Sequence, residues 1–193
     1  TIFKYLSLIG SFAVVGSLLA MGFLLLDSHG KLSTSAKKLR TMLWISGLTW
    51  TIGSIGVILF TLATILDQPL SFALDSTVLR SFLTQITLGQ YLLFQTLVAL
   101  VITFAAIRVN KILTVIALLI LTFIGLIAPV FQSHSASGGS HGLAIGSLVI
   151  HVVALSLWVG GVITLAILEP EDRPVAVPRF SQLALWAAIA VVL

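Results

Sequence analysis

Long apolar stretches that contain no charged residue constrain the fold of this chain most. Asp, Glu, Lys and Arg are absent from successive hydrophobic runs, each of which approaches or exceeds the roughly 20 residues that a membrane-spanning helix needs. Only 8% of the residues are charged, whereas soluble domains carry about 25%. A surface this poor in charge cannot face water, so lipid must surround the chain. An open chain in lipid satisfies its backbone hydrogen bonds only as helices.

We therefore predict an all-α fold, a polytopic transmembrane bundle of about six spans joined by short loops. The expected spans cover residues 6–26, 42–66, 88–107, 112–131 and 142–168, with a sixth that starts near Phe180. Thr1 is not an initiator methionine, and the last apolar run stops at Leu193 in mid-span. We expect a part of a longer polypeptide on these grounds.

The charges of the loops predict how the bundle is oriented. Basic residues occupy alternate loops: Lys31, Lys37, Lys38 and Arg40 in the first, Arg108 and Lys111 in the third, and Arg173 and Arg179 in the fifth. The second loop carries Asp67, Asp75 and Arg80, and the fourth has no Lys or Arg. Because cytoplasmic loops are enriched in Lys and Arg, the N-terminus is predicted outside, with Lys4 as the one objection. The net charge of +4 thus reflects topology, and no nucleic-acid partner is expected.

The segment near residues 75–87 has its own helical pattern. Asp75 is a candidate N-cap, and the apolar residues Val78, Leu79, Phe82, Leu83 and Ile86 recur at helical spacing after it. Two interpretations stay open. The segment is an external amphipathic helix at the membrane interface, or it extends the third span by packing.

Pairs of small residues four apart predict where helices approach closely. These pairs are Gly16 with Ala20, Thr49 with Gly53, Gly142 with Gly146, and Ser156 with Gly160. They indicate a packed bundle and carry no information about its cargo.

Histidine is the residue type that could carry chemistry here. The chain has no cysteine, and Met21 and Met42 are its only sulfur ligands, so soft chelation of Cu(I) by sulfur is poorly supplied. His134 and His141 flank a Gly-Ser-rich external loop, and His151 lies inside the fifth span. Imidazole binds copper, zinc and iron well. The alternatives are two solvated loop histidines, and a His151 that hydrogen-bonds to a neighbouring helix.

Helix geometry limits how these histidines could cooperate. Ten residues separate His141 from His151, which is about 15 Å of helical rise, so both cannot ligate one ion within a continuous helix. Ser147, His151, Leu155 and Trp158 form a stripe that we expect to face the bundle interior. A bis-histidine haem lacks a second intramembrane histidine. No acidic residue accompanies the histidines in the manner of a catalytic triad, so no catalytic residue is assigned and no enzymatic activity is expected.

The same region resembles the copper resistance D (CopD) family. His141-Gly142-Leu143-Ala144 and the run from His151 to Gly161, which includes Trp158-Val159-Gly160-Gly161, are similar to the element that opens the family's conserved domain. Arg179-Phe180-Ser181 looks like the start of that domain's next helix, and Thr87-Leu88-Gly89 resembles an earlier helix start in longer members. The resemblance is concentrated in residues 134–184.

This resemblance implies a multi-pass protein of the bacterial cytoplasmic (inner) membrane that takes part in copper uptake or resistance. It divides the chain into a four-span region at residues 1–131 and the start of a CopD-like domain at residues 132–193, truncated in the sixth span. His141 and His151 are the implied copper ligands, and His134 joins them by proximity. In actinobacterial relatives the region is fused to a domain similar to CtaG-type cytochrome oxidase assembly factors. Besides the lipid bilayer, expected partners are a respiratory oxidase or a periplasmic copper chaperone.

Two other functions remain open from the sequence. One is a non-catalytic assembly or accessory subunit of a respiratory cytochrome oxidase, for which stable co-purification without copper would speak. The other is a b-type haem or quinol electron carrier, for which a Soret absorption band would speak.

Overall fold

The computed structural model describes residues 2–25, 34–133 and 141–192, and the regular elements in these ranges are all helical. They are α1 (Ile2–Leu19), the π-helical η1 (Ala20–Leu24) that continues it, α2 (Thr34–Leu66), α3 (Leu70–Ala73), α4 (Ser76–Gln85), α5 (Thr87–Ala106), α6 (Ile112–Ile127), α7 (Val130–Ser133), α8 (His141–Ile167) and α9 (Arg173–Val192). The predicted all-α class is confirmed.

The predicted spans agree with long apolar helices at all but one position. Within the described ranges, 5 helices are long and apolar enough to cross a membrane: α1 with η1, α2, α5, α8 and α9. The fourth predicted span is divided instead into α6, with 16 residues, and the short α7. Pro129 lies between them, and proline cannot donate the backbone hydrogen bond that would continue the helix. At about 1.5 Å per residue, α6 alone is shorter than a hydrocarbon core of about 30 Å.

The last helix begins earlier than the sequence predicted. It starts at Arg173 rather than near Phe180 and contains Pro178. Pro178 lies within the first two turns, where few intrahelical hydrogen bonds are yet formed and a proline costs less than in mid-helix. The charged and proline-containing segment before Phe180 is therefore the first part of α9.

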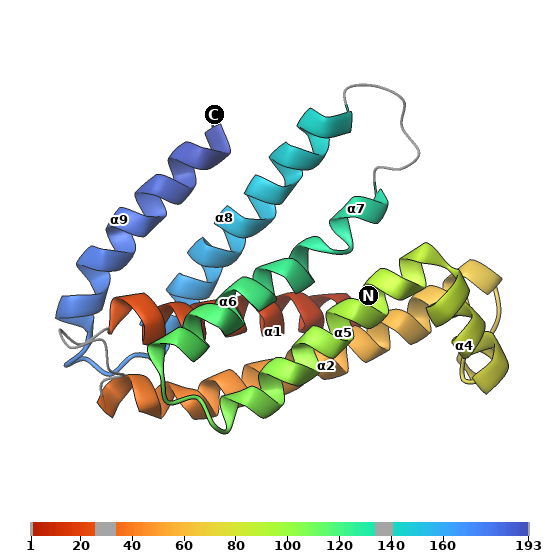
Figure 1. Cartoon of the computed structure of the whole chain (residues 1–193), viewed down its shortest axis with the longest axis horizontal. Helices are drawn as coiled ribbons and strands as arrows, with labels where there is room; N and C mark the ends of the chain where they lie inside the picture. The colour runs from red at the N-terminus through yellow and green to blue at the C-terminus, as the bar shows by residue number, and fades with distance from the viewer. Residues whose placement is uncertain (1, 26–33, 134–140, 193) are drawn as a thin grey trace.

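Helix α1 forms the centre of the bundle. It packs against α2, α6 and α8, and 61% of its most apolar stretch is buried, compared with 11% for α9. Figure 1 shows α1 running among the other spans, while α8 and α9 extend away from them at an angle. Among the described residues the buried polar side chains are serines and threonines, whose hydroxyls bond mainly to carbonyls of their own helix.

Glycines set the closest helix contacts. A Cβ atom on Gly16 of α1 would collide with the carbonyl oxygen of Gly160 in α8 and with Thr164 Oγ1. A Cβ atom on Gly53 of α2 would collide with the backbone of Ser7 in α1. Three of the predicted small-residue pairs thus contribute a contact residue. For Gly146 the prediction of a close helix contact is wrong, because no described atom of another element lies within 4 Å of a Cβ placed there.

The spans alternate in direction, so the loops gather at two ends. In Figure 1 the links from α5 to α6 and from α8 to α9 lie at the same end as the start of α2, and the opposite end holds α4, α7 and the start of α8. The first end carries Arg40, Arg108, Lys111, Arg173 and Arg179 together with the acidic Glu169, Glu171 and Asp172, and the second carries Asp67, Asp75 and Arg80, with Lys4 near the start of α1. This arrangement matches the predicted separation of loop charges. That the basic end is cytoplasmic, and the N-terminus outside, remains a prediction.

Helix α4 is an element of its own and does not extend α5. Asp75 caps it, since its Oδ1 accepts hydrogen bonds from the amides of Thr77 (2.9 Å) and Val78 (3.1 Å). Ile86 has extended backbone angles and separates it from α5. Its apolar side packs on the bundle: Phe82 is buried in a cluster with residues of α2, α3 and α5. Its place in the membrane interface remains a prediction.

Candidate functional site

The three predicted metal ligands differ in how far the structure describes them. His134 lies outside the described residues. His141 is the first residue of α8, and its side chain lies outside the description as well. His151 is described fully, about 2.8 turns into the same helix. Because one continuous helix carries His141 and His151, their separation of about 15 Å along the axis holds, and they cannot bind one ion together.

The ring of His151 has a defined orientation. Its Nδ1 atom lies 2.8 Å from the backbone carbonyl oxygen of Ser147. A carbonyl oxygen accepts hydrogen bonds and cannot donate them, so Nδ1 carries the proton in this contact. The neutral ring then has its lone pair on Nε2, the atom that would bind a metal ion. A backbone carbonyl that fixes the tautomer in this way is a common partner of metal-binding histidines.

The stripe that contains His151 does not face the bundle interior, which corrects the prediction. Ser147, His151, Leu155 and Trp158 are all exposed, and Trp158 has 53% of its surface accessible. The interior face of α8 instead carries Ser156, Gly160 and Thr164, which pack on α1. Small residues bring helix backbones together in lipid, and this preference outweighs the polarity of one histidine. The spacing of Ser156, Gly160 and Thr164 was the signal for the buried face.

His151 opens onto an apolar groove between α8 and α9. The groove has a volume of about 510 Å³, and His151 and Trp158 of α8 line it together with small residues of α9 that include Ala184, Ala187 and Ala188. Among the lining residues that the structure describes, His151 is the only titratable one. The site therefore offers one imidazole nitrogen in hydrophobic surroundings.

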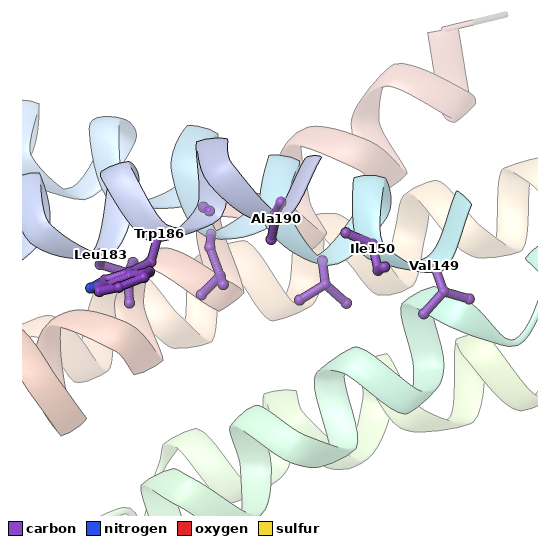
Figure 2. A pocket seen from close by; sticks show the side chains of 9 residues that line it. Val149, Ile150, Leu183, Trp186 and Ala190 are labelled. Atoms are coloured by element: carbon purple, nitrogen blue, oxygen red, sulfur yellow. The ribbon is translucent and has the colours of Figure 1, made fainter. Parts of the chain in front are cut away.

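A second apolar groove lies on the other side of the contact between α8 and α9. Figure 2 shows Val149 and Ile150 of α8 and Leu183, Trp186 and Ala190 of α9 along it. Its volume is about 380 Å³, and its lining carries no titratable side chain. It offers no metal ligand.

The glycines after Trp158 serve packing. Gly160 touches the backbone of α1 near Phe12 and Gly16, and a Cβ on Gly161 would collide with the ring of Phe180 in α9. Phe180 belongs to the Arg-Phe-Ser element. Two motifs noticed separately in the sequence thus meet at one helix contact. Trp158 itself makes up part of the groove rather than of the core.

Arginines at the basic end bind helix carbonyls. Arg173 donates from Nε to the carbonyl oxygen of Leu168 (3.2 Å) at the end of α8. Arg179 donates from Nη1 to the carbonyl oxygens of Leu24 (2.9 Å) and Phe23 (3.3 Å) at the end of η1. Terminal carbonyls lack intrahelical partners, so both arginines stabilise helix ends. The sequence predicted only their effect on topology.

The described residues contain no group of three or more His, Cys, Asp or Glu side chains that could together hold a metal ion. A site built on His151 would need ligands from the loop before α8 or from another molecule. The structure thus defines one oriented imidazole rather than a complete coordination sphere.

These features define the class: a helical protein of the membrane with a bundle centred on α1. Residues 2–144 match the family described as "Copper resistance protein D-like, N-terminal domain". Since this match spans most of the chain, the chain belongs to that family. No curated protein and no solved structure matches it.

The family match confirms the resemblance to CopD proteins and extends it. It covers the N-terminal spans, where the sequence motifs were weakest, and it ends before His151. His134 and His141 lie within the matched range. The division of the chain at residues 131 and 132 stays a prediction.

Proposed function

We propose that this chain is a non-enzymatic protein of the bacterial cytoplasmic membrane that handles copper during uptake or resistance, with copper as its cargo. Membership of a copper resistance family supports this role. The observation that carries the site is the orientation of His151: its Nδ1 is bonded to the Ser147 carbonyl, which leaves Nε2 ready for a metal ion.

The histidines have successive roles in this proposal. His134 and His141, at the external end, capture the ion. His151 receives it nearly three turns into the helix, roughly 15 Å further along α8. The imidazole type of ligand suits copper, whereas the chain has no cysteine for thiolate binding. Trp158 and the other residues that line the groove give His151 apolar surroundings.

In the isolated chain His151 alone binds copper weakly, and a further ligand completes the site during transfer. The groove around it is lined otherwise by apolar residues and Trp158. We propose that this ligand comes from a membrane partner that packs against α8 and α9, a respiratory oxidase that receives the ion, whereas a periplasmic copper chaperone would deliver it to His134 and His141 at the external end. In this arrangement the exposed position of His151 serves transfer between proteins.

Copper binding to the purified full chain tests the proposal. We would measure copper content and affinity for the wild type, His141→Ala and His151→Ala, with copper supplied in both oxidation states. Two stations about 15 Å apart predict that each variant loses one site and retains the other. His29 is the remaining histidine of the chain and follows the first predicted span, on the predicted cytoplasmic side. His29→Ala removes an imidazole there and should bind copper like the wild type.

Two results would count against the proposal. Wild-type protein without bound copper at saturating supply would refute copper handling by this chain and favour an accessory role. Copper binding that is unchanged in both variants would refute the ligand assignment alone. A Soret band that is present in the wild type and absent in His151→Ala would show that His151 binds haem instead of copper.

A further inference from the structure

A groove at the basic end of the bundle has the features of a lipid headgroup site. Arg40, Thr41 and Trp44 of α2 line it together with Ala106 and Ile107 at the end of α5, and its volume is about 200 Å³. It lies at the end of the molecule where the α5–α6 link is found, opposite the end that holds the start of α8 (Figure 1). It is independent of the proposed copper site.

The charge around this groove is positive and uncompensated. The guanidinium of Arg40 is held by one hydrogen bond from Nη1 to Asn110 Oδ1, 3.0 Å long. Arg108 and Lys111 flank Asn110 and are exposed. Throughout the described ranges no carboxylate pairs with Arg40, Arg108 or Lys111, and Asn110 is the one side chain to which Arg40 donates a hydrogen bond. An arginine has five N–H donors, so Arg40 keeps donors for an anion.

Apolar surface continues directly from the charged groups. Trp44 is 40% exposed and Ile107 is 59% exposed. Farther along the same helices, Leu48 of α2 and Phe104 of α5 are exposed as well. Tryptophan is enriched at the boundary between headgroups and hydrocarbon. The groove therefore offers cations on one side and an apolar surface on the other. This arrangement matches a lipid, which has an anionic headgroup and apolar acyl chains.

We propose that this groove binds an anionic phospholipid of the adjacent leaflet. The lipid phosphate would accept hydrogen bonds from Arg40 and lie near Arg108 and Lys111. Its acyl chains would lie along Trp44 and Ile107. The bond to Asn110 holds Arg40 in place before the lipid arrives. Basic pockets between spans on the cytoplasmic side bind anionic headgroups in this manner, and the loop charges predict this end to be cytoplasmic.

Native mass spectrometry of the full chain tests this inference. The protein would be exchanged into micelles with equal amounts of phosphatidylglycerol and phosphatidylcholine, and retained lipid would be measured by titration. The wild type should retain phosphatidylglycerol in excess. Arg40→Gln should weaken its binding about fivefold, the effect of about one charge at a membrane surface. Arg108→Gln with Lys111→Gln should weaken it further, and Arg40→Lys should weaken it least.

Arg80→Gln is the matched control, because Arg80 is exposed on α4 at the opposite end. It should bind phosphatidylglycerol like the wild type. If Arg40→Gln does not fold, the double variant in the exposed α5–α6 link carries the test. Equal retention of phosphatidylglycerol by wild type and the basic-end variants would overturn the proposal, as would an equal loss in Arg80→Gln. Inorganic phosphate or glycerol phosphate that binds as tightly as the lipid would show that a soluble anion is the ligand.

Discussion

At the scale of single residues, backbone contacts at glycines hold the helices of the bundle together. Gly16 and Gly160 let α1 and α8 touch backbone to backbone, and Thr164 adds its hydroxyl to the same contact. Small residues at a spacing of four pointed to this crossing because lipid provides little hydrophobic force between helices, so close packing matters more. Gly146 has the same spacing but no neighbour. A spacing alone cannot show whether another helix lies opposite.

Gly16→Ala and Gly160→Ala should both destabilise the protein. The added methyl group has no room at either position, and overpacking of this kind costs about 1–3 kcal/mol. Thermal or denaturant unfolding in detergent measures the loss. Gly146→Ala is the matched control on α8, since its Cβ would meet nothing within 4 Å. Because alanine also favours the helix more than glycine does, this control should keep or gain stability, and a loss as large as in the other two variants would contradict the packing explanation.

Arg179 should stabilise the end of η1 through its hydrogen bonds to Phe23 and Leu24. We expect Arg179→Gln to lower the free energy of unfolding by about 1 kcal/mol, the usual net value of a hydrogen bond, and Arg179→Lys to lower it less. Faster hydrogen exchange near residues 20–25 would locate the effect. Unchanged exchange there in Arg179→Gln would contradict the capping role.

At the scale of elements, the sequence predicted helices well and their ends less well. The range of α5 agreed within one residue, because polar or charged residues bound it on both sides. The break between α6 and α7 at Pro129 and the early start of α9 were missed. In both cases the predicted range was the run of apolar residues. The helix itself begins and ends where its backbone hydrogen bonds do. The exposed stripe of α8 was missed for another reason. The prediction placed the polar His151 inside the bundle, whereas the small residues of α8 determine which face packs on α1.

The cap of α4 offers a test at this scale. Asp75→Ala should cost about 1 kcal/mol, because the amides of Thr77 and Val78 lose their acceptor. Hydrogen exchange of residues 76–85 should become faster while that of α5 stays unchanged. Asp75→Asn keeps an acceptor oxygen and should remain close to the wild type. Faster exchange in α4 and α5 together would instead indicate that the two helices open as one unit.

At the scale of the whole molecule, alternating spans and loop charges give the bundle two chemically distinct ends. The basic end holds arginines that bind helix carbonyls and the proposed lipid site, and the other end holds α4 and the start of α8 (Figure 1). The loop charges alone predicted this separation. The contact of Arg40 with Asn110 joins residues 70 apart in sequence, so no local pattern could reveal it.

Single cysteines can test the orientation without background, because the chain has no cysteine. Ser71→Cys and Glu171→Cys are both at exposed positions, on opposite ends of the bundle. A membrane-impermeant thiol reagent added to intact cells should label Ser71→Cys and leave Glu171→Cys unlabelled until the membrane is opened. The reverse pattern would place the N-terminus inside and the histidines on the wrong side for capture of external copper.

The candidate copper site could be predicted only in part. The sequence indicated which histidines to consider and that His141 and His151 are too far apart to share an ion. It could not indicate that the Ser147 carbonyl fixes the ring of His151 or that this ring faces outward. Orientation depends on which side of α8 packs on α1, and that is set by contacts between helices distant in sequence.

X-ray absorption at the copper edge of the loaded full chain tests the central claim most directly, since it reports the ligands of copper in either oxidation state. The account predicts scattering from imidazole rings in the wild type and a weaker imidazole signal in His151→Ala, with His29→Ala unchanged. Copper that shows no imidazole scattering, or a His151→Ala spectrum identical to that of the wild type, would contradict the role of His151 in copper handling.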